Sequence, residues 1–225
     1  MNQMSKIEPQ VDWALIDTVL LDMDGTLLDK YFDDYFWESY VPEKYAEKYL
    51  LDVESAHSVL IAKYKSREGT LDWTDLDFWS EELGLNIPAL KMKVDHLIQV
   101  HPYVVDFLKY CKKIQKKIFL VTNAHSKTLN IKMNRTTIGK YFDRIVCAEE
   151  VGCAKEEPVF WAKLQGMIDF DKEKTLLADD NEGVLRSARE HGIANLVYVA
   201  RPSSQSPICY SREFSSIVYF KELLS

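Results

Sequence analysis

The sequence predicts an α/β fold with a doubly wound parallel sheet and a helical domain inserted after its first strand. In the second half of this 225-residue chain, short apolar runs alternate with helical stretches. This alternation is typical of parallel sheets, because each crossover between parallel strands needs a connecting helix. Residues 31–100 instead place aromatic and charged residues at helical spacing. With 47% hydrophobic residues, the chain can bury a core of the required size.

The first expected element is a buried strand at residues 18–23, whose apolar run ends on Asp22. Beyond Asp29 the spacing becomes helical and is broken near Val41-Pro42, Gly69 and Gly84. His101-Pro102 then begins a helix that ends in a basic stretch, residues 112–117.

The rest of the chain alternates between strands and helices. We expect strands at residues 118–121, 144–147, 174–178 and 195–199, and helices at residues 126–138, 157–168 and 182–191. Residues 14–30 and 101–225 should form the core, with residues 31–100 as the inserted domain. The Ser- and Pro-rich residues 201–207 should form a loop before a weakly determined C-terminal segment.

Composition argues against several classes of partner. The formal net charge of −7 disfavours a nucleic-acid polymer, because binding to a phosphate backbone depends on clustered Lys and Arg. Residues 1–13 contain no apolar run typical of a signal peptide, and no later stretch has membrane-spanning length. We therefore expect a cytoplasmic protein with no membrane partner. Its four cysteines lack zinc-site or Cys-x-x-Cys spacing, which predicts reduced thiols.

Polar residues follow four of the predicted strands. In an open parallel sheet, ligands bind at the carboxyl ends of the strands, so these residues should meet. They are Asp22-Met23-Asp24-Gly25-Thr26 after the first strand, Thr122-Asn123 after the second, Lys155 beyond the third, and Asp179-Asp180 after the strand before the last.

This set of groups suits phosphoryl transfer. A carboxylate at Asp22 can attack phosphorus and form an aspartyl-phosphate if the charges on both anions are neutralised. Lys155, backbone amides and magnesium would neutralise them. Magnesium prefers oxygen ligands, and we expect it on Asp22, Asp180 and the backbone carbonyl of Asp24, with Asp179 beside these ligands.

Asp24 has a predicted role of its own as the acid and base. It lies two residues after Asp22 and reaches the leaving oxygen if the chain turns at Gly25. It would first donate a proton and then activate water.

Each of these residues also has an ordinary structural explanation. An Asp at a strand end often caps a helix, Thr-Asn often forms a turn, and a single Lys is often a surface charge. A calcium-binding EF-hand loop is a further alternative for Asp-x-Asp-Gly, but it needs Gly at its sixth position and Glu at its twelfth. Gly25 comes too early and follows a strand.

The ordered set of motifs resembles the haloacid dehalogenase superfamily over its whole Rossmann-like core. This resemblance implies a magnesium-dependent phosphatase in which Asp22, Asp24, Thr122 and Lys155 are catalytic, and Thr122, Asn123 and Lys155 bind substrate. The helical insert resembles the cap of that superfamily, a lid that excludes bulk water and contributes substrate contacts.

The third motif departs from the pattern of the superfamily. It is Ala154-Lys155-Glu156-Glu157-Pro158 rather than Gly-Lys-Pro. The assignment of Lys155 therefore rests partly on its position, and Lys163 in the following helix is the alternative.

More narrowly, the chain resembles the bacterial GMP/IMP nucleotidases in both the core and the insert. The resemblance implies a purine nucleoside 5′-monophosphate as substrate. It is carried by residues 17–29 (DTVLLDMDGTLLD), 35–37 (YFW), 41–43 (VPE), 79–81 (WSE) and 122–125 (TNAH). Residues 31–80 also hold 12 of the 27 aromatic residues, which suits stacking on a flat base. Because such residues more often form the core of a helical bundle, the sequence identifies no stacking residue.

Other functions remain open on the same residues. A sugar-phosphate phosphatase or phosphomutase would differ only in contacts from the insert. A dehalogenase would need neither magnesium nor the acid at Asp24. A non-catalytic interaction module would be expected to lack at least one of the four chemical groups, and all four are present.

Overall fold

The computed structural model describes residues 6–67 and 70–224. Within these residues, a six-stranded sheet has the order β3-β2-β1-β4-β5-β6, and all neighbouring strands are parallel. The strands are β1 (Thr18–Leu21), β2 (Lys117–Thr122), β3 (Arg144–Cys147), β4 (Thr175–Asp179), β5 (Asn195–Val199) and β6 (Ser215–Ile217). This order reverses direction at β1, so a crevice for ligands is expected where the ends of β1, β2 and β4 meet.

The central strands are buried on both faces, which explains their continuous apolar runs. Successive side chains point to opposite faces of the sheet, so Val19 and Leu21 join one hydrophobic cluster whereas Leu20 joins the other. In β2, Leu120 and Val121 are divided in the same way.

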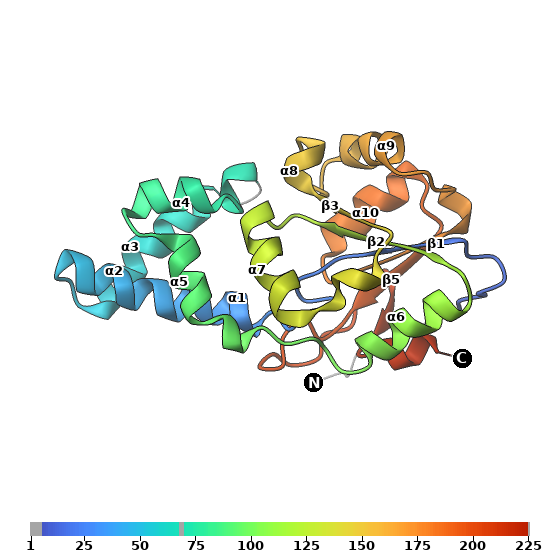
Figure 1. Cartoon of the computed structure of the whole chain (residues 1–225), viewed down its shortest axis with the longest axis horizontal. Helices are drawn as coiled ribbons and strands as arrows, with labels where there is room; N and C mark the ends of the chain where they lie inside the picture. The colour runs from blue at the N-terminus through green and yellow to red at the C-terminus, as the bar shows by residue number, and fades with distance from the viewer. Residues whose placement is uncertain (1–5, 68–69, 225) are drawn as a thin grey trace.

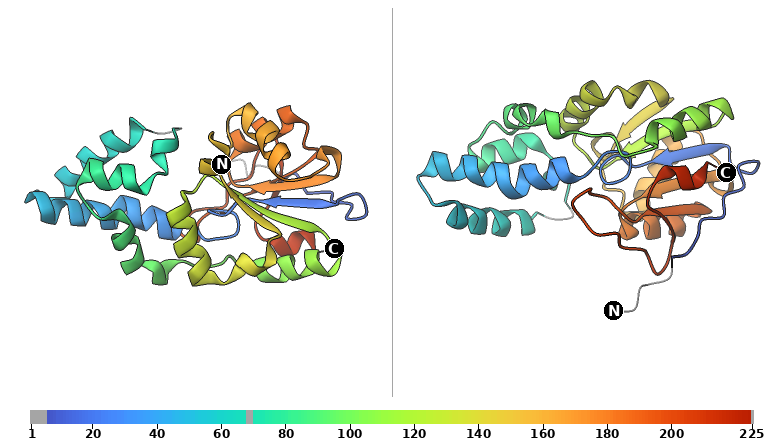
Figure 2. Two further views of the ribbon diagram at one scale, coloured as in Figure 1. Left: turned by 45° about the horizontal axis from the view of Figure 1, so that its top comes forward. Right: turned by 90° about the horizontal axis from the view of Figure 1, so that it is seen from below.

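Helices cover both faces of the sheet (Figures 1 and 2). On one face lie α8 (Ala148–Val151), α9 (Pro158–Met167) and α10 (Glu182–His191), and on the other lie α6 (Val104–Lys113), α7 (Ser126–Thr136) and the C-terminal 3₁₀ helix η6 (Phe220–Leu223). Two further 3₁₀ turns are η4 (Ile138–Tyr141) and η5 (Lys172–Lys174). The expected doubly wound arrangement is confirmed.

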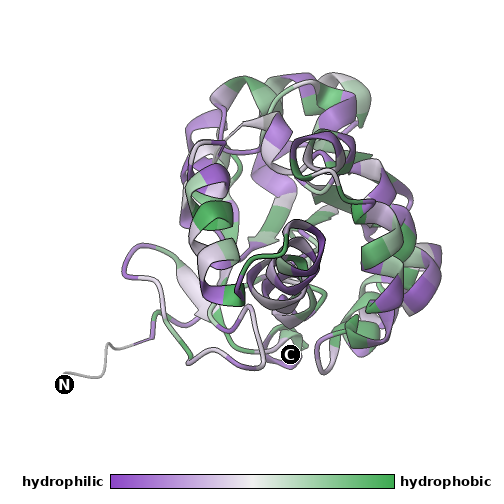
Figure 3. Ribbon diagram, turned by 90° about the vertical axis from the view of Figure 1, so that its left-hand side faces the viewer, coloured by the Kyte–Doolittle hydropathy of each residue, from purple (hydrophilic) through white to green (hydrophobic). Residues whose placement is uncertain are grey.

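Between β1 and α6, the regular elements of the described residues are all helices and lie within residues 31–97, which we call the helical insert. It lies to the left of the sheet in Figure 1. It contains α1 (Tyr31–Tyr35), the π-helical segment η1 (Phe36–Tyr40), α2 (Val41–Tyr49), α3 (Val53–Lys65), η2 (Leu71–Trp73), α4 (Leu76–Leu83), α5 (Ile87–Lys93) and η3 (Asp95–Leu97). Its helices carry both hydrophilic and hydrophobic residues (Figure 3), as expected when each buries one side. The division into a core and a separate domain stays a prediction.

One expected break in the insert is wrong. The chain continues helically through Val41-Pro42, and the π-helical segment η1 directly before Pro42 accommodates a residue that has no N–H to donate. The break at Gly84 is confirmed, since Gly84 ends α4 with a φ of +61°. Gly69 lies outside the described residues.

The other differences concern short elements. The sequence did not predict α8 or the edge strand β6, which have four and three residues respectively and are too short for a clear period. The Ser- and Pro-rich segment is a loop, as expected. Cys111, Cys147 and Cys153 are buried free thiols, and Cys209 is exposed. Within the described residues, we find no helix of the length and apolarity that crossing a membrane would require.

Candidate active site

A pocket of about 590 Å³ opens at the carboxyl ends of β1, β2 and β4, and the helical insert forms its far wall. All the site residues predicted from sequence line it: Asp22, Asp24, Thr122, Asn123, Lys155, Asp179 and Asp180. They come from four separate parts of the chain, and the parallel sheet brings them to one edge.

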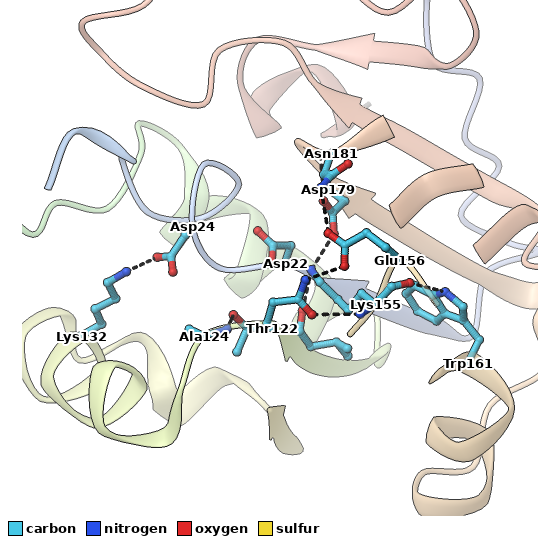
Figure 4. Close-up of polar contacts among 12 residues, drawn as sticks. Asp22, Asp24, Thr122, Ala124, Lys132, Lys155, Glu156, Trp161, Asp179 and Asn181 are labelled. Carbon is cyan, nitrogen blue, oxygen red and sulfur yellow. Dashed lines mark hydrogen bonds and ion pairs between the residues drawn. The ribbon is translucent and has the colours of Figure 1, made fainter. Parts of the chain in front are cut away.

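The Lys155 ammonium is the central charge of this site (Figure 4). Its Nζ donates to Asp22 Oδ1 at 2.6 Å and to Asp179 Oδ2 at 2.7 Å, and it also contacts the carbonyl oxygen of Val121 at 3.2 Å. Burial lowers the pKa of Lys155, but the two carboxylates outweigh this effect and hold it above its usual value. Lys163 contacts Val151 and Cys153 outside the pocket, so the geometry favours Lys155 over the alternative.

The backbone of Lys155 is held by two further contacts. Its N–H donates to Asn123 Oδ1 at 3.0 Å, and its carbonyl accepts from Trp161 Nε1 at 3.1 Å. Trp161 is fully buried and also donates to Ser187 Oγ. These contacts fix the lysine although its motif lacks the usual glycine.

Three carboxylates crowd together beside Lys155. Oxygens of Asp22, Asp179 and Asp180 all lie within 4.8 Å of one another. Burial raises the pKa of Asp179 to about 7, with Asp22 adding to the effect and Lys155 opposing it. The pKa of Asp180 lies well above its usual value because of burial and the charges of Asp22 and Asp179. The cluster therefore carries more negative charge than Lys155 neutralises.

This cluster has the donor set of a divalent cation site. Hard cations prefer carboxylate oxygens, and Asp22 Oδ2 is a buried oxygen with no hydrogen-bond partner among the described residues. Gly25 allows Asp180 to approach, because a Cβ at this position would lie 2.3 Å from Asp180 Oδ2. The residues present therefore fit a magnesium ion.

Asp24 points away from this cluster. Its Oδ1 accepts from Lys132 Nζ at 2.6 Å, and its carboxylate is not among the three crowded oxygens. Burial raises the pKa of Asp24 to about 6, although Lys132 opposes the shift. A carboxyl group with this pKa can hold or release a proton near neutral pH, as an acid and base must.

Two residues that sequence reasoning missed connect the loops around the pocket. Glu156 accepts from Asn123 Nδ2 at 2.8 Å and from Asn181 Nδ2 at 3.0 Å. Asn181 also caps α10 by accepting from the N–H of Gly183. In the sequence, only their positions directly after Lys155 and Asp180 suggested that they lie near the site. Thr122 Oγ1 accepts from the N–H of Ala124 at 3.0 Å and faces the same space.

The far wall of the pocket belongs to the insert. Aromatic residues Trp37, Tyr64, Trp73 and Trp79 line it together with the carboxylates Asp34 and Glu38. Trp79 is almost fully buried and packs edge to face against Tyr64, with ring centroids 5.1 Å apart. Many of the aromatics of the insert therefore form its core, while some also face the pocket.

Comparison with known proteins identifies the family. The family model for haloacid dehalogenase-like hydrolases matches residues 16–192, which includes every motif described above. The chain belongs to the haloacid dehalogenase-like hydrolases. Its fold is the one that the sequence resemblance implied, and its relatives indicate a phosphatase of this family.

Three similar proteins each cover most of the chain. The GMP/IMP nucleotidase YrfG of Escherichia coli is 35% identical over 194 residues, covering 86% of this chain and 87% of that protein. A phosphorylated carbohydrates phosphatase of Thermotoga maritima is 22% identical and covers 93% and 97%. The crystal structure of a HAD phosphatase from Thermococcus onnurineus superimposes with a TM-score of 0.79 at 20% identity, covering 92% of this chain and 96% of that one.

Gly25 provides a test of the geometry of the carboxylates. Its φ of +85° is strained for any other residue, and a Cβ would collide with Asp180. We expect Gly25→Ala to lower the free energy of unfolding by about 1–3 kcal/mol. We also expect it to reduce phosphatase activity by at least about 10-fold, because Asp180 must move. Denaturant unfolding and phosphate release measure the two effects.

Gly166 is the matched control, because it lies in α9 and a Cβ there meets no atom within 4 Å. Gly166→Ala should leave activity unchanged and stabilise the helix by about 0.5–1 kcal/mol. Equal behaviour of the two variants would contradict the predicted role of Gly25.

Proposed function

We propose that this protein is a magnesium-dependent phosphomonoesterase that hydrolyses purine nucleoside 5′-monophosphates. The observation that carries the chemistry is the environment of Asp22. Asp22 lines the pocket, and Lys155 holds Oδ1 of this buried carboxylate, while Oδ2 has no hydrogen-bond partner among the described residues. This arrangement supports Asp22 as the nucleophile.

In the first step, Asp22 attacks phosphorus and the bond to the ester oxygen breaks. Asp24 donates its proton to the departing oxygen, leaving an aspartyl-phosphate on Asp22. In the second step, Asp24 removes a proton from water, which attacks the same phosphorus. The bond between phosphorus and the Asp22 oxygen breaks, which restores the Asp22 carboxylate and releases inorganic phosphate. Thr122, Asn123 and Lys155 would bind the phosphoryl oxygens with neutral and cationic donors.

Magnesium would be held by Asp22, Asp180 and the backbone carbonyl of Asp24. When bound, it supplies positive charge that offsets the anionic nucleophile and the phosphoryl group. Asp179 would act beside these ligands by holding Lys155, to which it is hydrogen bonded.

The insert supports the substrate assignment. The relative with 35% identity is named a GMP/IMP nucleotidase, and that similarity extends through the insert as well as the core. A pocket of about 590 Å³ lies in the usual range for sites that take a molecule of nucleotide size. Its aromatic wall suits a flat base, and its carboxylates suit the N–H groups of a purine with a carbonyl at position 6.

A sugar phosphate is the second candidate. The similarity to a phosphorylated carbohydrates phosphatase over 93% of the chain favours it. Either substrate is a small phosphomonoester, so the same core residues would act on both. The cytoplasmic location stays a prediction from sequence.

Substitution of Asp22 tests the nucleophile. We expect Asp22→Asn to lower kcat by roughly 10³-fold or more, because an amide does not form the phosphorylated intermediate. Circular dichroism should remain native, since the amide has nearly the same volume as the carboxylate. The control is Asp169→Asn, whose side chain is 98% exposed and which should retain full activity. Wild-type activity in Asp22→Asn would contradict the mechanism.

Metal binding should depend on pH in a defined direction. The raised pKa values mean that folded Asp179 and Asp180 bind protons that the unfolded chain releases. Without metal, stability should therefore fall as pH rises from about 4 through about 7. Because magnesium replaces these protons, it should raise the Tm more at about pH 8 than at about pH 6.

Thermal unfolding with EDTA or magnesium at the two pH values measures this effect. EDTA should also abolish phosphate release, and added magnesium should restore it. Asp180→Asn should lose most of the magnesium-induced shift in Tm. A shift that is larger at the lower pH, or full activity in EDTA, would exclude a cation at these carboxylates.

A panel of phosphomonoesters tests the substrate. We expect kcat/KM to be higher for IMP and GMP than for pyrimidine monophosphates or hexose phosphates, because the insert selects the leaving group. Phosphate release from each substrate at saturating magnesium gives the ranking. A hexose phosphate at the top would favour the second candidate and leave the roles of the core residues unchanged.

A further inference from the structure

Four buried or half-buried charges connect Asp24 to the helical insert. Lys132 of α7 donates to Asp24 Oδ1 at 2.6 Å and also to Asp33 Oδ2 of α1. Lys91 of α5 donates to the other oxygen of Asp33, Oδ1, at 2.8 Å. The order is therefore Asp24, Lys132, Asp33, Lys91, with alternating negative and positive charges. We call these residues the charge chain.

The two lysines of the charge chain are almost inaccessible to water, with side chains 1% and 2% exposed. Lys91 Nζ also lies 4.7 Å from the ring centroid of Phe36 and 5.0 Å from that of Phe32, so aromatic faces complete its surroundings. A buried ammonium needs its carboxylate partners, because water cannot reach the group and take their place as a hydrogen-bond partner. Each link of the chain therefore constrains the next.

The charge chain fixes one oxygen of Asp24 and leaves the other available. Among the described residues, Asp24 Oδ1 accepts from Lys132, whereas Oδ2 has no hydrogen-bond partner. Asp24 also lines the pocket that holds Asp22 and Lys155. An acid held through one oxygen can present the proton on the other in a fixed direction.

We propose that Lys132 is a positioning residue that anchors Oδ1 of Asp24, so that Oδ2 delivers the proton to the ester oxygen of the substrate. Asp33, which Lys91 holds in place, fixes Lys132 in turn. Lys132 donates to Asp33 as well as to Asp24, so its positive charge is divided between the two carboxylates. The inference rests on the proposed function, in which Asp24 protonates the leaving oxygen as the P–O bond breaks.

This role has a kinetic signature that a structural role lacks. Departure of a nucleoside requires a proton on the ester oxygen, because an alkoxide is a poor leaving group. Departure of 4-nitrophenolate does not, because that anion is stable at neutral pH. The value of kcat/KM covers all steps up to departure of the leaving group and excludes the later hydrolysis of the intermediate. Loss of Lys132 should therefore affect the two classes of ester differently.

The experiment compares kcat/KM for IMP and for 4-nitrophenyl phosphate in wild type and Lys132→Met at saturating magnesium. We expect a fall of about 100-fold for IMP and of less than about 3-fold for 4-nitrophenyl phosphate. The ratio of the two values in one preparation does not depend on how much of the protein is folded. If Lys132→Met yields no folded protein, Lys132→Gln gives the same comparison.

Two further variants test the assignment. Lys132→Arg retains a cation that can donate to both carboxylates, and its ratio should return to within about 3-fold of wild type. When Asp24 is already replaced by Asn, Lys132→Met should not change the ratio of the two kcat/KM values further, because the acid that Lys132 positions is then absent.

Lys127 is the matched control on the same helix. Its side chain is 47% exposed, and its Nζ lies 2.6 Å from Asp77 Oδ2 of α4, so it joins α7 to the insert without touching Asp24. Lys127→Met should leave the ratio unchanged. An equal fall for both esters in Lys132→Met, or an equal change of ratio in Lys127→Met, would overturn the inference.

The outcome also separates this inference from the proposed function. If wild type hydrolyses another alkyl phosphate better than IMP, that ester replaces IMP, and the ratio still tests Lys132. If wild type hydrolyses no phosphomonoester with magnesium, the proposed function and this inference both fail.

Discussion

The site depends on the buried hydrogen bonds that the Lys155 ammonium makes to two carboxylates. It joins Asp22 after β1 to Asp179 at the end of β4, and its own backbone is held by Asn123 after β2. Removing one member of such a buried pair typically costs about 3–5 kcal/mol, because the remaining charge lacks a partner. The lysine therefore links three strand ends and orients Asp22, the proposed nucleophile.

The same cluster remains short of positive charge. Lys155 balances one of three crowded carboxylates, and burial together with the neighbouring negative charge raises the pKa values of Asp179 and Asp180. The close approach of Asp180 is possible because Gly25 has no Cβ. The fold thus keeps mutually repelling carboxylates together at the edge of the sheet, and a divalent cation bound there would relieve this repulsion.

The sheet and the insert contribute different groups to the pocket. The sheet supplies the groups that suit a phosphoryl group, and these are compatible with any monoester. The insert supplies the aromatic wall and, through Asp33 and Lys91, the buried charges that extend to Asp24. A change in the position of the insert would therefore alter both the space in the pocket and the contacts that hold Asp24, the proposed acid.

The sequence by itself predicted the parallel sheet, its longer helices and a set of candidate site residues that the structure brings to one edge, because these motifs follow local apolar runs and parallel strands end at one edge. It could identify neither the edge strand β6, which is too short for a clear period, nor the helical continuity through Pro42. Only the tertiary structure shows that the residues of the charge chain contact one another, because Lys132 lies 108 residues from Asp24 and 99 from Asp33 in the sequence. In the sequence these are ordinary charged residues of amphipathic helices, and only burial between packed helices makes them partners.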